Sequence, residues 1–217
     1  MSPIQYLLFD LDDTLYTNAS GLFREVGKRI ETWLSQTLGL SPAEAQALRG
    51  HYYQTYGTTM AGLLREHPEV DIEHYLRYVH TIDVSPYLNP DPALDKMLSR
   101  LSVPKAIFTN SVAEWAERVT RRLGVRHHFT QIFDVRGLSY QGKPHPRAYT
   151  QVLQRLELPG EACVLLDDQP SYLHGAAQAG MHTILVGSSE SSHDGVEFAV
   201  GSLLEAEPIL LKLLERY

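Results

Sequence analysis

Three acidic residues follow directly after a short apolar run near the start of the chain. The run Tyr6 to Phe9 is typical of a strand buried on both faces, and it leads into Asp10, Asp12 and Asp13. A desolvated carboxylate without a partner is costly, so packing does not explain these acids. On an extended chain, Asp10 and Asp12 point to the same side. They indicate a metal site, a nucleophile with an acid–base partner, or both; the alternative is an Asp-rich turn or a helix N-cap pair.

Further polar side chains stand at the ends of later apolar runs. Thr109 and Asn110 follow the second predicted strand, Asp167 and Asp168 follow the fourth, and Lys143 stands between them in the sequence. Ligands of open α/β sheets bind at the carboxyl ends of the strands, where such side chains meet. Magnesium takes oxygen ligands and typically one or two carboxylates. We therefore expect the acids to share one Mg²⁺, with Thr109 and Lys143 binding phosphate oxygens.

Apolar runs with strand character alternate with helical patterns along most of the chain. Such alternation predicts an α/β fold with a mostly parallel sheet covered on both faces. Ser111 is the expected N-cap of one of the helices. The predicted strands are residues 6–9, 105–109, 131–135, 162–166 and 182–186, and the predicted helices are 112–123, 147–156, 171–179 and 203–214.

Residues 17–85 break this alternation and read as helices only. Ser41, Pro42 and Glu44 resemble a capping box with proline at the first helical position. We expect an all-α unit inserted after the first strand, so residues 1–16 and 86–217 would form the α/β core. The four helices of this unit are predicted at residues 22–38, 42–54, 58–66 and 72–80.

Composition limits the classes of partner. Nineteen basic and 26 acidic residues give a formal net charge of −7, which argues against binding a nucleic acid polymer. Apolar stretches fall short of a membrane span, and the N-terminus lacks a secretory pattern. The single cysteine, Cys163, lies in an apolar run and excludes an intramolecular disulfide. We expect a cytoplasmic monomer or homodimer that acts on a small molecule.

In combination, these motifs resemble the haloacid dehalogenase superfamily, in its phosphatase branch. The resemblance spans essentially the whole chain, and the helical insertion matches the C1-type cap of many members. It implies a Rossmann-like three-layer core, magnesium dependence and an aspartyl-phosphate intermediate. Asp10-Leu11-Asp12-Asp13-Thr14 fits the first motif, Thr109-Asn110 the second, Lys143-Pro144 the third and Asp167-Asp168 the fourth.

The resemblance also implies roles for the acids. Asp10 would be the nucleophile that attacks phosphorus. Asp12 would protonate the leaving oxygen, activate the hydrolytic water and offer its backbone carbonyl to Mg²⁺. Asp168 would ligate the metal directly, with Asp167 ligating through water or orienting the site. Asp13 is left for a turn or capping role.

Further roles concern the phosphoryl group. Lys143 and Thr109 would stabilise its charge, and Asn110 would help through its amide groups. An acid at Asp12 favours phosphoryl chemistry over dehalogenation, because a halide leaves without a proton.

Within the superfamily, the chain looks most similar to pyrimidine 5′-nucleotidases. This likeness rests on residues 9–16, on Tyr56-Gly57-Thr58-Thr59 followed by Gly62-Leu63, and on the four-helix cap. It implies that nucleoside 5′-monophosphates, pyrimidines preferred, are the substrates. The residues expected nearest the substrate are Tyr16, Tyr56, Thr58 and Thr59.

The fourth motif departs from the pattern of relatives. Gln169 and Tyr172 stand where Ser and Asn are usual, which puts the support of the metal site and the substrate subclass in doubt. The alternatives are a phosphatase for sugar phosphates or phosphoglycolate, and a phosphomutase. A non-catalytic phosphoryl-binding regulatory protein is the rival from another class.

Overall fold

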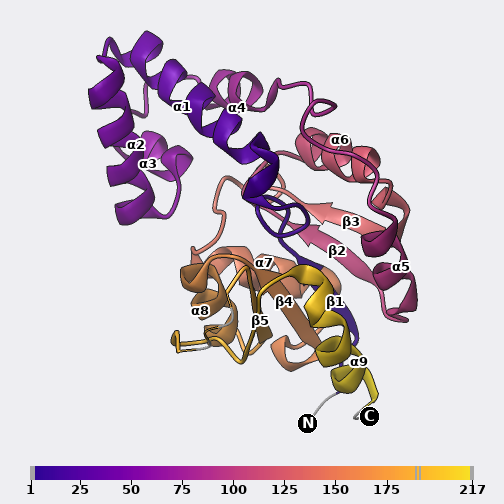
Figure 1. Cartoon of the computed structure of the whole chain (residues 1–217). Helices are drawn as coiled ribbons and strands as arrows, with labels where there is room; N and C mark the ends of the chain where they lie inside the picture. The colour runs from indigo at the N-terminus through magenta and orange to yellow at the C-terminus, as the bar shows by residue number, and fades with distance from the viewer. Residues whose placement is uncertain (1–2, 189, 191, 216–217) are drawn as a thin grey trace.

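A parallel β-sheet forms the centre of the computed structural model, which describes residues 3–188, 190 and 192–215 (Figure 1). Its six strands lie in the order β3-β2-β1-β4-β5-β6, and every neighbouring pair is parallel. The predicted α/β fold is confirmed. The strands in the described part of the chain are β1 (Tyr6–Phe9), β2 (Lys105–Phe108), β3 (Phe129–Phe133), β4 (Cys163–Asp167), β5 (His182–Val186) and β6 (Phe198–Val200).

Helices flank the sheet and form the insertion after β1 (Figure 1). None in the described residues is long and apolar enough to cross a membrane. The insertion contains α1 (Leu22–Leu38), α2 (Pro42–Tyr56), α3 (Thr59–Glu66) and α4 (Ile72–His80). The remaining α-helices are α5 (Pro92–Arg100), α6 (Ala113–Leu123), α7 (Pro146–Leu156), α8 (Pro170–Gln178) and α9 (Glu207–Glu215); short 3₁₀-helices are Asn18–Ser20, Arg126–His128, Gly160–Ala162 and Leu203–Ala206.

The central strands alternate their side chains between two hydrophobic clusters. Leu7 and Phe9 of β1 face a cluster that includes residues of α5, α6 and α9, whereas Tyr6 and Leu8 face residues of α7 and α8. This period of two is what a strand with both faces covered requires. The arrangement gives the three-layer core that the alternation of elements predicts.

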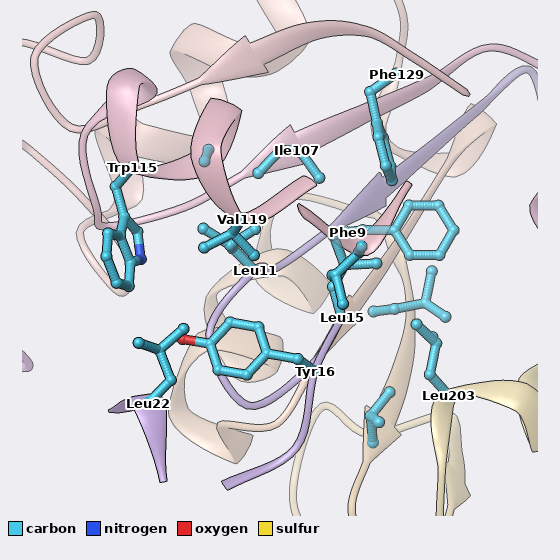
Figure 2. Close-up of a cluster of buried hydrophobic side chains, with 14 of the residues drawn as sticks. Phe9, Leu11, Leu15, Tyr16, Leu22, Ile107, Trp115, Val119, Phe129 and Leu203 are labelled. Atoms are coloured by element: carbon cyan, nitrogen blue, oxygen red, sulfur yellow. The ribbon is translucent and has the colours of Figure 1, made fainter. Parts of the chain in front are cut away.

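Apolar packing against α6 holds the loop after β1 in place. Leu11, Leu15 and Tyr16 are buried, and they pack in one cluster with Trp115 and Val119 of α6 (Figure 2). Burial of an aliphatic or aromatic side chain contributes about 1.5–3 kcal/mol. The apolar residues of the first motif therefore hold in place the backbone that carries its acids.

The helices of the insertion begin and end close to the predicted residues. Ser41 and Glu44 form the predicted capping box at the start of α2. Helix α2 extends two residues beyond its predicted end, and Gly57 stops it in the left-handed region at φ 83°. Thr58 is the N-cap of α3 rather than its first residue, because its Oγ1 accepts from the N–H of Ala61 at 3.0 Å.

One α-helix and one strand lie outside the predicted pattern. Helix α5 begins at Pro92 after the N-cap Asp91, and β6 adds a short edge strand beside β5. The last predicted helix divides, because a 3₁₀-helix precedes α9 and Pro208 stands in the first turn of α9, where proline is tolerated.

Two helical glycines of the insertion give opposite expectations for stability. A Cβ on Gly62 of α3 would lie 2.5 Å from Cδ1 of Tyr52, whereas a Cβ on Gly50 of α2 would meet nothing within 4 Å. Gly62→Ala should therefore lower the free energy of unfolding by about 1–3 kcal/mol through overpacking. Gly50→Ala should raise it by about 0.5–1 kcal/mol, the usual gain in helix propensity. Urea unfolding of both variants measures this difference, and equal effects would contradict the packing described.

Candidate active site

A buried ion-pair cluster lies at the carboxyl ends of two central strands. Asp10 follows β1, Asp167 ends β4, and these strands are direct neighbours. The fully buried ammonium of Lys143 donates to Oδ1 of Asp10 at 2.8 Å and to Oδ2 of Asp167 at 2.5 Å. Burying an ammonium is costly unless carboxylates replace its water. The buried charge of Lys143 is therefore stable only while both carboxylates are present.

The charges of the cluster do not cancel. Burial raises the pKa of Asp10 well above its ordinary value; Lys143 opposes this rise and Asp167 adds to it. Burial alone would lower the pKa of Lys143, but Asp10 and Asp167 hold it above its usual value. Burial, followed by the charge of Asp167, raises the pKa of Asp168 to about 7. A single ammonium thus faces three acids.

The donor set of these acids fits a hard divalent cation. One carboxylate oxygen each from Asp10, Asp167 and Asp168 lies within 4.8 Å of the others. Every donor is an oxygen, which is the ligand type that Mg²⁺ prefers. A divalent cation would also offset the excess negative charge. Asp13, in contrast, sits in a turn within the first motif with φ 63°, consistent with the turn role expected for it.

Asp12 is held by donors from two parts of the chain. Its Oδ1 accepts from the hydroxyl of Tyr16 and from Nε1 of Trp115 at 2.9 Å, and its Oδ2 accepts from Oγ of Ser111 at 2.7 Å. The prediction that Ser111 caps α6 is wrong. Val112 is the N-cap and provides no side-chain bond, because the serine hydroxyl is engaged with Asp12. The ring of Trp115 is buried, and its indole N–H makes this polar contact.

Thr109 and Asn110 follow β2 at the same edge of the sheet. Oγ1 of the buried Thr109 accepts from the N–H of Ser111 at 3.0 Å. Nδ2 of Asn110 donates to the carbonyl of Lys143 at 2.8 Å, and its Oδ1 is buried without a partner among the described residues. Asn110 therefore fixes the backbone that carries the lysine.

A cavity of about 420 Å³ separates the insertion from the core. Asp10, Asp12, Thr109, Asn110 and Asp168 line it, so the structure brings these predicted residues together. Lys143 and Asp167 lie directly behind them in the ion-pair cluster. The insertion contributes an apolar wall of Phe23, Val26, Ile30, Met60, Leu76 and Val79, with polar side chains of Glu31, Gln46 and Arg49.

The four residues expected nearest the substrate divide into two pairs. Thr58 and Thr59 line the cavity. Tyr16 does not line it, and its hydroxyl instead donates to Asp12. Tyr56 also lies outside the lining, and its hydroxyl donates to Glu66 at 2.7 Å within the insertion.

Sequence reasoning missed the contacts of Ser111, Trp115 and Arg49. Ser111 and Trp115 reach Asp12 across 99 and 103 positions of the chain. Arg49 lies on α2, pairs with Glu31 at 2.9 Å and lines the cavity. No local pattern signals such contacts; a serine directly after Thr109-Asn110 is the nearest clue.

The family model described as "Hydrolase: haloacid dehalogenase-like hydrolase" matches residues 4–180, most of the chain. The chain belongs to the haloacid dehalogenase-like hydrolases. "Phosphate metabolism protein 8" of Saccharomyces cerevisiae is 26% identical to it over 197 residues, which cover 82% of this chain and 60% of the yeast protein. The chain therefore spans about 60% of the length of that relative.

Two other proteins match along nearly their whole length. "Glyceraldehyde 3-phosphate phosphatase" of Methanocaldococcus jannaschii is 25% identical over 231 residues, covering 97% of this chain and 98% of that protein. The HAD-hydrolase YfnB of Bacillus subtilis, solved bound to magnesium, has a TM-score of 0.62 at 17% identity, covering 96% of this chain and 99% of that chain. The structural likeness supports the fold.

Cation binding at the acids should be visible as a gain in stability. At a concentration 100 times its Kd, Mg²⁺ should raise the free energy of unfolding by about 2.7 kcal/mol, and chelator should reverse the gain. Asp168→Asn should lose this gain, while the exposed Asp194→Asn should keep it. Thermal unfolding with and without Mg²⁺ measures the effect. An equal gain in both variants would remove Asp168 from the cation site.

Proposed function

We propose that this hydrolase is a magnesium-dependent phosphomonoesterase that forms an aspartyl phosphate on Asp10 and prefers pyrimidine nucleoside 5′-monophosphates. The observation that carries the proposal is the buried Lys143 ammonium on Asp10, beside the acids Asp167 and Asp168. In this reading residues 1–16 and 86–217 are the catalytic core, and residues 17–85 are a substrate-selecting cap.

Asp10 attacks in the first half-reaction. An oxygen of its carboxylate forms a bond to phosphorus as the bond from phosphorus to the ester oxygen breaks. The ammonium of Lys143 offsets negative charge that the phosphoryl group brings into the buried site. Thr109 lines the same cavity and supplies a hydroxyl at the end of β2. Asn110 supports the step by fixing the lysine backbone.

Asp12 moves the proton. As a general acid it gives a proton to the leaving oxygen, and as the resulting base it takes a proton from the water that hydrolyses the aspartyl phosphate. Its contacts with Ser111, Trp115 and Tyr16 orient the carboxylate for both steps. In this assignment Tyr16 is a positioning residue.

The carboxylates of Asp10 and Asp168 and the backbone carbonyl of Asp12 would hold Mg²⁺. Bound there, the cation would reduce the repulsion between Asp10 and the substrate phosphate. Asp167 has one oxygen on Lys143 and accepts from the N–H of Gln169 at 2.9 Å with the other. These contacts favour an orienting role for Asp167 over direct ligation.

The cavity supports a nucleotide as the substrate. Its volume of about 420 Å³ falls within the range of small-molecule sites, about 300–1,000 Å³. The apolar wall suits a flat base better than a polyhydroxyl sugar. Arg49 is held beside this wall by Glu31, and its guanidinium can donate to base carbonyls. Thr58 and Thr59, at the start of α3, add hydroxyls to the lining of the cavity.

Hydrolysis of a sugar or triose phosphate is the second candidate. It is favoured by the likeness to the glyceraldehyde 3-phosphate phosphatase along nearly the whole chain. The two candidates share the proposed chemistry at Asp10 and differ in the group that the insertion contacts.

Substitution of the two acids of the first motif should affect different steps. Asp10→Asn should abolish turnover, because an amide is a poor nucleophile, and no phosphoenzyme should form. Asp12→Asn should slow both half-reactions by roughly 10²- to 10⁴-fold. Rapid-quench measurements of the phosphoenzyme and of phosphate release separate these effects. Normal turnover of the Asp10 variant, or an Asp12 effect on substrate affinity alone, would contradict the assignment.

A panel of phosphate esters tests the substrate. The value of kcat/KM should be highest for pyrimidine nucleoside 5′-monophosphates and lower for triose and hexose phosphates. Arg49→Met should raise KM for nucleotides by about tenfold, the loss expected for a hydrogen bond to a charged group. Arg65→Met, on the exposed side of α3, is the matched control. Faster hydrolysis of sugar phosphates than of every nucleotide would establish the second candidate instead.

A further inference from the structure

Side-chain hydrogen bonds to the core are found both at the α4 end of the insertion and at its α2–α3 end. At the α4 end, Nε of Arg136 in the core donates to both carboxylate oxygens of Glu73 at 2.9 and 3.0 Å, and the hydroxyl of Tyr140 donates to Glu73 at 2.9 Å. This end is also joined to the core through the chain that leaves α4. The α2–α3 end has no such covalent connection nearby, so its docking depends on non-covalent contacts.

Four residues, which we call the latch, make the contact at the α2–α3 end. The hydroxyl of Tyr53 donates to Oε1 of Gln169 at 2.5 Å, and the hydroxyl of Tyr172 donates to the carbonyl of Gly57 at 2.9 Å. A Cβ on Gly57 would collide with the ring of Pro144, so glycine permits this close approach. The two core members of the latch, Gln169 and Tyr172, are the residues that depart from the fourth motif.

Gln169 connects the latch to the acids of the site. Its Nε2 donates to Oδ2 of Asp168 at 2.5 Å, and its backbone N–H donates to Oδ1 of Asp167 at 2.9 Å. An ionised carboxylate, the form that binds a cation, can only accept, so the amide nitrogen faces Asp168 and the amide oxygen is left for Tyr53. Burial, with nearby acids adding to it, raises the pKa of Tyr53 to about 12. The phenol therefore remains a donor at neutral pH.

We propose that Gln169 is a positioning residue that couples cation binding at Asp168 to docking of the α2–α3 end on the core. A bound cation would fix the carboxylate of Asp168, which the neighbouring acids otherwise repel. The fixed carboxylate would hold the side-chain amide of Gln169, and this amide would in turn hold the hydroxyl of Tyr53. The coupling is reciprocal, so the hydroxyl of Tyr53 strengthens cation binding from the other side of the cavity. This inference rests on the proposed function, because it takes Asp168 as a ligand of Mg²⁺.

Removal of single hydroxyl groups tests the coupling without any substrate. Tyr53→Phe removes the hydroxyl that donates to Gln169 and keeps the ring. Tyr56→Phe is the matched control, because the hydroxyl of Tyr56 lies on the same helix and donates to Glu66 inside the insertion. Gln169→Ala removes the connection itself. Mg²⁺ affinity is measured by calorimetry, docking is measured by hydrogen exchange of residues 53–59 with and without Mg²⁺, and thermal unfolding in chelator checks the fold.

We expect Mg²⁺ affinity to fall in Tyr53→Phe, to fall further in Gln169→Ala and to stay unchanged in the control. Wild type and Tyr56→Phe should bind Mg²⁺ alike and gain protection at residues 53–59 when it binds. Tyr53→Phe should weaken Mg²⁺ binding about three- to tenfold, and Gln169→Ala about ten- to 100-fold. Both should lose most of the Mg²⁺-dependent protection.

Two other outcomes would overturn the inference, and they are distinguishable. If Tyr53→Phe matches Tyr56→Phe in affinity and in protection, the latch is a static contact and the proposed function stands. If Mg²⁺ does not bind wild type at all, the inference and the magnesium site of the proposed function are both wrong.

Discussion

The arrangement at the sheet edge depends on one buried ion pair network, the ammonium of Lys143 between Asp10 and Asp167. The lysine is fully buried, so it can remain charged only while both carboxylates replace its lost water. Removal of one partner from such a network typically costs about 3–5 kcal/mol. The ends of β1 and β4 and the loop that carries Lys143 are therefore held to one another by charge as well as by sheet hydrogen bonds.

The network also leaves charge unbalanced at the cavity. Among the described residues, no ammonium pairs directly with Asp168, and burial beside Asp167 makes its ionised form costly. That cost is what a divalent cation would relieve. The same strands that bury the lysine thus bring oxygen donors together on the side that faces the cavity. The same group of carboxylates therefore stabilises the buried lysine and offers ligands to a cation.

The carboxylates of the site differ in the hydrogen-bond donors that contact them. Asp10 contacts an ammonium, whereas Asp12 contacts two hydroxyls and an indole N–H. Asp168 instead accepts from the amide of Gln169, which in turn accepts from Tyr53 of the insertion. Three acids of the same chemistry therefore have different partners, and in our proposal different roles.

Local pattern alone determined much of this protein. Buried strands read as apolar runs, and α1 and α4 begin and end at the predicted residues because capping residues and apolar periodicity are local signals. The ends of these apolar runs also predicted that the acids of the site stand at the ends of strands. Only the tertiary structure decided the donors of Asp12, the turn of Tyr56 toward Glu66, and the bridge from Tyr53 to Gln169 across 116 positions. These contacts depend on how helices, strands and loops pack against one another, and no local pattern records which side chains such packing brings face to face.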